Sequence, residues 1–377
     1  MVLRLVVASD KFKGTLTSAE VADAVRVGVR RVCPGATVVS VPVADGGDGT
    51  LSAAVAAGYT HVPVVASGPT GEPVRSGYAR SGDTAVVELA DVSGLVHLPG
   101  GIPAPLTATS YGTGELIAAA LDAGCTRIIL GIGGSASTDG GTGLIAALTH
   151  SPGSPTTTAG DWEQAIACSR SLGLVTARLD GVRVVVACDV DNPLTGPRGA
   201  AAVYGPQKGA TAEQVVELDG RLSAWADLVA EHTGRDLRDA PGAGAAGGVG
   251  FAALALLGAE LRPGIDLVLD LVRFREHAAG ADLVITGEGA LDEQTLHGKA
   301  VAGVAAASTV PVVAVCGVNR LEPQQLQELG VSAAYALTDL EPDVRRCIAE
   351  PRPLLEQLGE RIAVDHLTMA RTAKGLA

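Results

Sequence analysis

Short apolar runs alternate along this chain with segments of helical periodicity. Seven runs have the length and continuity of strands that are buried on both faces, and each is bounded by Gly, Asp or another turn-forming residue. They are Leu3–Ala8, Val38–Val43, Ala85–Leu89, Ile128–Ile132, Val182–Ala187, Leu283–Thr286 and Val312–Cys316. Uninterrupted apolar strands of this kind are typical of parallel sheets that helices cover on both sides.

Six segments between or after these runs have a helical pattern: Ser18–Val32, Gly114–Ala123, Ala212–Glu231, Phe251–Gly258, Ala300–Ala307 and Leu354–Ala370. Thr17 or Ser18 ahead of Glu20 predicts an N-terminal cap for the first of them. The alternation of strand and helix predicts an α/β fold, with open sheets and right-handed crossovers. Two turn-rich stretches, Gly68–Gly77 and Ser151–Gly160, interrupt the pattern, and the second reads as a surface insert.

Polar motifs follow five of the predicted strands. Ligands of doubly wound sheets bind at the carboxyl ends of the strands, so these motifs are candidates for the functional site. They are SDKFKGT at 9–15, ADGGDGT at 44–50, GGSASTDGG at 133–141, CDVDNP at 188–193 and GEGALD at 287–292. Carboxylates, hydroxyls and Gly-rich backbone are therefore expected at one sheet edge.

This inventory matches the needs of phosphoryl transfer. Phosphate oxygens require free backbone N–H donors, and Gly133–Gly141 and Ala243–Gly250 are the best candidates to supply them. Magnesium requires one or two carboxylates, which Asp189 with Asp191, or Asp45 with Asp48, could provide. A substrate hydroxyl requires a carboxylate as base.

The distribution of basic residues supports an anionic ligand. The chain has five lysines against twenty-three arginines, and four of the lysines lie in Gly- and Asp-rich segments: Lys11, Lys13, Lys208 and Lys299. Lysine acts as a point charge toward phosphate, whereas the planar fork of Arg favours bidentate pairing. A solvated surface position would be the simpler explanation for any one of these lysines, but it does not explain all four together.

Several motifs have competing interpretations. Asp45 and Asp48 lie in a sequence that forms turns without any functional reason, and Asp139 could cap a helix that starts at Gly141. A partial dinucleotide fingerprint, Gly131-x-Gly133-x-x-Ala136, leaves an NAD-dependent oxidoreductase as an alternative. A third reading is a small-anion binding protein without turnover. The sequence has no P-loop, no His-Arg-Asp kinase loop and no G-x-S-x-G elbow.

Composition narrows the class further. A chain of 377 residues predicts two domains or one large one, and its net charge of −13 argues against nucleic acid or an anionic membrane as partner. The six cysteines are widely spaced without zinc-binding patterns, which predicts reduced thiols and a cytoplasmic protein. The charge-free stretch 241–259 just reaches spanning length, but six glycines favour a loop leading into a buried helix.

Taken together, the motifs resemble those of the bacterial glycerate kinase family. The matching segments span nearly the whole chain in order: ASDKFKGTLTSAEVADAV (8–25), PVADGGDGT (42–50), TSYGTGELI (109–117), GIGGSASTDGGTG (131–143), ACDVDNPLTGPRGAAAVYGPQKGA (187–210), PGAGAAGGVGFA (241–252) and ITGEGALDEQTLHGK (285–299). The resemblance implies an ATP- and magnesium-dependent kinase that phosphorylates D-glycerate, at the 2-hydroxyl or alternatively at the 3-hydroxyl.

The resemblance also implies an architecture and roles. Two α/β domains with mainly parallel sheets are expected, with the active site in the cleft between them. The first, flavodoxin-like, domain comprises 1–76 plus 283–377, and 77–282 is inserted. The 10–13, 45–48 and 288–292 loops are expected on the first domain and the 189–192 loop on the second. Expected catalytic residues are Asp189, Lys11, Lys13, Asp45 and Lys299; substrate-binding residues Asp10, Asp48, Asp191, Asn192, Glu288 and Asp292; nucleotide-binding residues Gly133, Gly134, Ser135, Lys208, Gly247 and Gly248; and metal ligands Asp189 and Asp191.

The chain departs from the family pattern at 149–160, where a Pro/Ser/Thr-rich stretch replaces the expected continuation. Oligomeric state, and the division of base and metal-ligand roles among the aspartates, stay open at this point.

Overall fold

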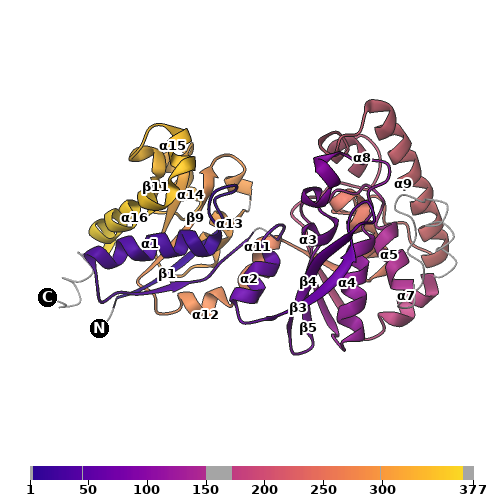
Figure 1. Ribbon diagram of the computed structural model, residues 1–377, viewed down its shortest axis with the longest axis horizontal. Helices are drawn as coiled ribbons and strands as arrows, with labels where there is room; N and C mark the ends of the chain where they lie inside the picture. Colours follow the sequence, from indigo (N-terminus) through magenta and orange to yellow (C-terminus); the bar gives the residue numbers. More distant parts are fainter. Residues whose placement is uncertain (1–2, 45, 150–171, 298, 368–377) are drawn as a thin grey trace. The chain divides into compact units, whose positions relative to one another are not determined.

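The computed structural model describes residues 3–44, 46–149, 172–297 and 299–367. Contacts divide the chain into two compact units: unit 1 comprises Met1–Asp45 and Ile265–Ala377, and unit 2 comprises Gly46–Gly264. Each unit is built on its own sheet (Figure 1). The predicted α/β class with two mainly parallel sheets is confirmed.

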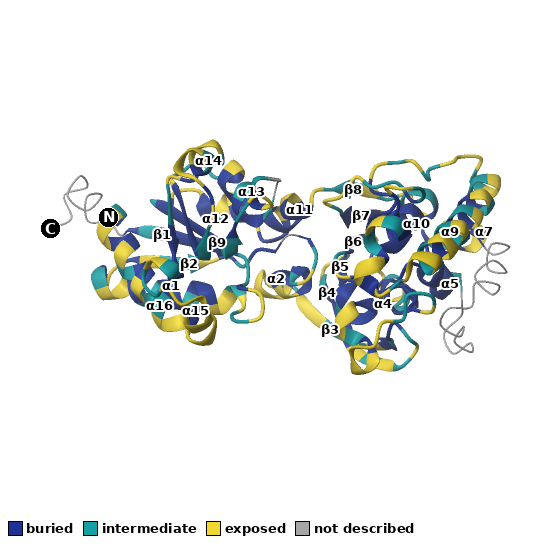
Figure 2. Ribbon diagram, turned by 90° about the horizontal axis from the view of Figure 1, so that it is seen from above, coloured by how far each residue is buried: buried dark blue, intermediate teal, exposed yellow. Residues whose placement is uncertain are grey.

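Unit 1 contains a five-stranded sheet in the order β11-β10-β9-β1-β2, and every neighbouring pair is parallel. The strands are β1 (Arg4–Ser9), β2 (Thr37–Ser40), β9 (Leu283–Leu291), β10 (Val312–Asn319) and β11 (Ala333–Ala336). The buried residues of the three central strands, β10, β9 and β1, are almost all apolar, as expected for a sheet covered on both faces. In Figure 2, β1 and β9 are drawn partly in the colour of buried residues and partly in that of intermediate ones.

The helices of unit 1 are α1 (Ser18–Val32), α11 (Gly264–Leu271), α12 (Phe274–Ala278), α13 (Ala300–Ala307), α14 (Pro323–Glu328), α15 (Val344–Ala349) and α16 (Pro351–Ile362), followed by a single π-helical turn at Ala363–Leu367. Thr17 and Glu20 form the predicted capping box of α1. Helices α1 and α16 lie side by side (Figure 1), and their backbones meet closely because Gly28 has no side chain. A Cβ at Gly28 would lie 1.9 Å from the carbonyl oxygen of Glu356.

Unit 2 contains a six-stranded sheet in the order β3-β4-β5-β6-β7-β8. The strands are β3 (Thr60–Ser67), β4 (Pro73–Ser81), β5 (Thr84–Glu88), β6 (Arg127–Gly131), β7 (Arg183–Ala187) and β8 (Glu260–Arg262). The pairs β3–β4 and β4–β5 are antiparallel, and β5 through β8 are parallel. The carboxyl ends of β5, β6 and β7 therefore meet at one edge.

The helices of unit 2 are α2 (Thr50–Ala56), α3 (Ala90–Ser93), α4 (Tyr111–Asp122), α5 (Thr142–Thr149), α7 (Leu172–Arg178), α8 (Ala200–Tyr204), α9 (Ala212–Thr233) and α10 (Val249–Leu256), with 3-10 turns at Leu95–His97, Pro99–Gly101, Pro206–Lys208 and Ala245–Gly248. A continuous apolar core lies between the sheet and these helices, and Trp225 of α9 is its largest fully buried side chain. The indole N–H of Trp225 donates to the carbonyl of Gly140 at 3.1 Å, which fixes α9 against the 133–141 loop.

All seven predicted strands are present, but the sequence interpretation missed β3, β4, β8 and β11. Strands β8 and β11 have only three and four residues. The stretch Gly68–Gly77, predicted as turns, in fact contains the tight turn between β3 and β4 and the first half of β4. Strand β9 runs on to Leu291, so Glu288 lies within a strand and not in a loop as predicted.

The boundaries between the units differ from the predicted 76/77 and 282/283. Strands β3 and β4 pair with β5 and so belong to unit 2, whereas α11 and α12 belong to unit 1. The boundaries therefore fall at 45/46 and 264/265. The insert Ser151–Gly160 lies outside the described residues.

Among the described residues, no helix combines the length and the apolar character needed to cross a membrane. The glycine-rich stretch 241–259 forms turns and the eight-residue buried helix α10 instead.

Candidate active-site loops

Four polar motifs of unit 2 meet at the carboxyl edge of its sheet. A Cβ at Gly133 would lie 2.7 Å from the Cα of Gly47, so the first and second Gly-rich loops touch. The 188–193 motif contacts the 242–250 segment, because the Gly244 N–H donates to the Asn192 carbonyl at 2.8 Å, and that segment in turn packs on the 133–141 loop. Segments that are far apart in the sequence, 46–50, 133–141, 188–193 and 242–250, thus form one cluster of loops.

The two predicted phosphate cradles pack directly against each other. Gly247 adopts a φ of +68°, and a Cβ there would lie 2.1 Å from the carbonyl oxygen of Ser137. Gly248 has a φ of +95°, and a Cβ there would lie 2.6 Å from the Cα of Gly140. Only glycine satisfies both the left-handed backbone and the close approach. Gly247 and Gly248 therefore shape the cradle by packing, and both are buried.

The opposite end of the 133–141 loop faces outward. Gly134 is exposed and Gly133 partly so, whereas Ser135 is buried and its backbone pairs with Gly94. The side-chain hydroxyls of Ser137 and Thr138 are buried and have no hydrogen-bond partner among the described residues. The accessible backbone of this loop is thus confined to its first two glycines.

Lys208 differs from the other three lysines because it is buried, with an exposed fraction of 3%. Its ammonium group donates to the Ser135 hydroxyl at 2.8 Å and to the Ser137 carbonyl at 2.6 Å. Burial lowers its pKa to about 7, although the Asp139 carboxylate opposes this shift. Lys208 therefore braces the 133–141 loop from inside.

Asp139 caps the start of α5, in agreement with the capping role considered from the sequence. One carboxylate oxygen accepts from Gly141 N–H at 3.1 Å, and the other accepts from Gly143 N–H at 3.2 Å at the start of α5. The second oxygen also accepts from the N–H and hydroxyl of Ser110, both at 2.8 Å. This carboxylate ties α4 to α5 and is 6% exposed.

The carboxylates after β7 lie at the surface. Asp189 is exposed, and one of its oxygens accepts from Gly264 N–H at 2.8 Å. Asp191 is exposed and forms a 3.5 Å ion pair with Arg198. Asn192 has a structural role, since its side chain donates to the Arg198 carbonyl at 2.9 Å and accepts from the Tyr204 hydroxyl at 2.6 Å.

The loop before α2 is held by a residue that the sequence interpretation missed. Asp48 is exposed on this loop, and the neighbouring N–H groups of Gly49 and Leu51 donate to the buried carboxylate of Glu88 at 3.0 and 2.9 Å. Desolvation raises the pKa of Glu88 to about 7. The signal in the sequence was a single acidic residue within the apolar strand run 85–89. Asp45 lies outside the described residues.

A second set of candidate residues belongs to unit 1, at the carboxyl ends of β1 and β9. The Asp10 N–H donates to the Gly287 carbonyl at 2.9 Å, which joins the lysine loop to β9. The carboxylate of Asp10 accepts from the Lys11 N–H at 2.7 Å. Lys11 is partly exposed and Lys13 fully exposed.

The strand β9 and the turn after it position three further candidates. Glu288 accepts from the Thr295 hydroxyl at 2.6 Å, and Asp292 accepts from the Gln294 N–H at 2.9 Å. The Lys299 ammonium donates to the Gln294 side chain at 2.7 Å. The predicted residues therefore form two groups, one at each sheet. Asp48 belongs to unit 2, contrary to the expected placement of its loop on the first domain.

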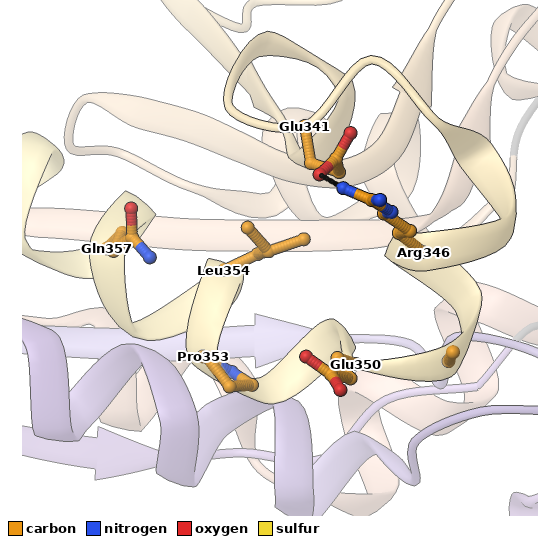
Figure 3. Close-up of a pocket in the computed structure, with 7 residues that line it drawn as sticks. Glu341, Arg346, Glu350, Pro353, Leu354 and Gln357 are labelled. Atoms are coloured by element: carbon orange, nitrogen blue, oxygen red, sulfur yellow. Dashed lines mark hydrogen bonds and ion pairs between the residues drawn. The ribbon is translucent and has the colours of Figure 1, made fainter.

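Unit 1 also contains a hollow of about 440 Å³ (Figure 3). Its lining comes from α15, α16 and the preceding loop, and includes the ion pair of Glu341 and Arg346 at 3.3 Å. None of the predicted site residues lines this hollow. Among the described residues, no cluster of three or more His, Cys, Asp or Glu side chains has the arrangement of a metal site.

Comparison with known proteins identifies the class. The sequence profile described as "Glycerate kinase family" matches residues 5–367. Glycerate kinase of Bacillus subtilis is 46% identical over 89% of this chain and 90% of its own length. Glycerate 2-kinase of Escherichia coli is 42% identical over 89% of this chain and 90% of its own length. A solved structure described as a glycerate kinase 2 of Salmonella typhimurium LT2 is 38% identical, covers 99% of this chain and 100% of its own, and has a TM-score of 0.79.

The fold, the loops and these matches define an enzyme of the phosphotransferase class. The chain belongs to the glycerate kinase family.

Proposed function

We propose that this enzyme transfers the γ-phosphoryl group of ATP to the 2-hydroxyl of D-glycerate, giving 2-phosphoglycerate and ADP. The similarity to a relative named glycerate 2-kinase supports this regiochemistry. The observation that carries the proposal is the meeting of four loops at one sheet edge of unit 2, three of them Gly-rich. This is the arrangement that a phosphorylated nucleotide requires.

Nucleotide phosphates are assigned to the outward backbone of Gly133 and Gly134, with Ser135, Gly247 and Gly248 in support. The exposure of the first two glycines supports this assignment. The role proposed for Lys208 is indirect. The residue is 3% exposed and its amino group is occupied by the loop, so it would stabilise the cradle through its hydrogen bonds to Ser135 and Ser137.

Asp189 is proposed as general base or metal ligand, with Asp191 as a second metal ligand and Asn192 as a substrate-binding residue beside them. Exposed carboxylates directly after a buried strand fit magnesium, which takes one or two carboxylates together with phosphate oxygens and water. Magnesium would neutralise charge on the transferring group when bound with ATP.

In unit 1, Lys11, Lys13 and Lys299 are assigned to the charge of the substrate carboxylate and the phosphoryl group. Glycerate hydroxyls would be bound in unit 1 by Asp10, Glu288 and Asp292, and in unit 2 by Asp48. Asp45 is proposed as a catalytic residue. Loops of both units would then contribute to catalysis.

We further infer a cytoplasmic enzyme with small-molecule substrates. Five cysteines in the described ranges are free thiols: Cys33, Cys125, Cys188, Cys316 and Cys347. Unpaired cysteines are the rule in reducing compartments.

The test is phosphorus NMR of the product after incubation with ATP, magnesium and D-glycerate. A 2-phosphoglycerate resonance is the expected result. A 3-phosphoglycerate resonance would keep the family and overturn the regiochemistry, and unchanged ATP would overturn the proposal.

The role of Asp189 is tested by Asp189→Asn, with Asp180→Asn as a matched exposed control in the same unit. We expect turnover to fall by about a thousandfold in the first variant and to stay unchanged in the second, because loss of a positioned base or ligand typically costs 10²–10⁴. Equal turnover in the two variants would contradict the assigned role.

A further inference from the structure

Glu88 ends strand β5, and its carboxylate is 5% exposed. Both carboxylate oxygens accept backbone hydrogen bonds from one short segment: Oε1 from Gly49 N–H at 3.0 Å and Oε2 from Leu51 N–H at 2.9 Å. The N-cap residue of α2 is Gly49, which has no side chain to act as a cap. A residue distant in sequence therefore fastens the Asp48 loop to the sheet.

This position is costly for a carboxylate. Burial raises the pKa of Glu88, and the nearby carboxylates of Asp48 and Asp91 raise it further. Asp91 in turn accepts from the Ser76 hydroxyl at 2.7 Å, which holds it on the same side of the sheet. Only the two backbone N–H groups favour the charge. An apolar residue here would avoid the desolvation of a carboxylate but would leave the N–H groups of Gly49 and Leu51 without these acceptors, so the carboxylate serves to hold this loop.

The segment that Glu88 fixes also touches the predicted nucleotide loop. Glu88 pairs with Gly131 across β5 and β6, and Gly131 approaches the Gly46 carbonyl, where a Cβ would lie 2.8 Å away. Gly47 in turn contacts Gly133. The bonds from Glu88 therefore hold the backbone after Asp48, and the packing of Gly46 and Gly47 against the end of β6 and the loop after it holds the backbone before Asp48.

We propose that Glu88 is a positioning residue for the reaction, which acts by holding the Gly46–Leu51 loop so that Asp48 is presented to glycerate. The proposal rests on the proposed function, because the assignment of Asp48 to substrate binding comes from there. It differs in naming a residue that does not itself contact substrate.

The first test measures the loop without reference to activity. Hydrogen exchange followed by mass spectrometry compares wild type with Glu88→Gln, whose amide can accept from one N–H but opposes the other. Peptides covering 46–56 are expected to exchange about tenfold faster in the variant, with the rest of unit 2 unchanged. Glu115→Gln is the matched control, since Glu115 also accepts a backbone N–H, from Ser67 at 2.6 Å, but outside these loops.

The second test is kinetic, at about pH 8, where Glu88 is ionised. Glu88→Gln should raise the KM for D-glycerate by about tenfold while leaving the KM for ATP within about twofold. Glu88→Asp keeps the charge but is one methylene shorter, and should fall between the variant and wild type. It also serves as the second variant if Glu88→Gln folds poorly.

An unchanged KM for glycerate together with unchanged exchange would overturn the proposal. Faster exchange throughout unit 2 with both KM values raised would also overturn it, because this would indicate a structural role only. If wild type phosphorylates no glycerate while the 46–56 peptides respond as expected, the proposed function fails and the positioning of the loop stands.

Discussion

Lys208 offers a sharp physical test because it is the only lysine in the sequence between residues 46 and 264. Replacing it with methionine keeps the length and apolar stem of the side chain and removes the buried charge. The hydrogen bonds from Lys208 to Ser135 and Ser137 are then lost from the 133–141 loop, but the free-energy cost of burying an ammonium group is removed as well.

The magnitude follows from the lowered pKa. Lys208 has a pKa of about 7 in the folded protein, against 10.5 as the ordinary value. Between these pH values the unfolded chain binds more protons than the folded one, so stability rises with pH. From pH 7 to about pH 9.5, the wild-type protein should gain about 3 kcal/mol from this group alone. Lys208→Met should lack this gain.

Urea unfolding followed by tryptophan fluorescence is a suitable assay. The two tryptophans, Trp162 and Trp225, both fall in the sequence of unit 2, so the signal reports the unit that contains Lys208. The measured quantity is the free energy of unfolding of wild type minus that of Lys208→Met at each pH. Tyrosines and cysteines titrate alike in both proteins and cancel in the difference.

The reasoning predicts a difference that grows in favour of wild type by about 3 kcal/mol across this range. A difference that is flat with pH would refute the idea of a neutralised buried lysine. A difference that falls as pH rises would mean that Lys208 stays charged and that its hydrogen bonds require the charge.

Three further substitutions test the packing and the surface. Gly28→Ala should lower the free energy of unfolding of unit 1 by about 2 kcal/mol or more, because the new Cβ would overlap the Glu356 carbonyl. Gly220→Ala, at an open position of α9, should raise the free energy of unfolding by about 0.5–1 kcal/mol. Calorimetry measures both effects, and equal effects would contradict the α1–α16 contact. Asp191→Ala should change the free energy of unfolding by less than about 0.5 kcal/mol, because the ion pair of Asp191 with Arg198 is 3.5 Å long and highly exposed. A larger loss of free energy in chemical denaturation would mean that the loop after β7 contributes to the stability of the fold.

The strands that were predictable from sequence are those buried on both faces, because their apolar runs are continuous. Strand β3 lies at a sheet edge and contains Pro63, and its residues alternate between exposed and partly buried. Such a strand lacks a distinctive signal. The antiparallel β3–β4 hairpin, and with it the boundary near residue 45, could not be read from the pattern.

The candidate motifs could be found in the sequence because each has an unusual local composition. The residues that contact these motifs in space could not be found in this way. The sequence shows Lys208 and Ser135 as separate polar residues, and only the fold brings the ammonium within 2.8 Å of the hydroxyl. Likewise, the contact of Glu88 with Gly49 links residues that belong to different motifs. Roles that depend on contacts distant in sequence require the structure.

The division of the chain has a consequence for its synthesis on the ribosome. Unit 2 is continuous in sequence, so it can fold as soon as its last strand, β8, has emerged, whereas β1 must wait for β9, more than 270 residues later. Until then the edge of the apolar strand β1 that pairs with β9 stays unpaired, which is a state in which aggregation competes with folding. The order of translation thus leaves β1, one of the first strands to be made, without its partner β9 for most of the synthesis of the chain.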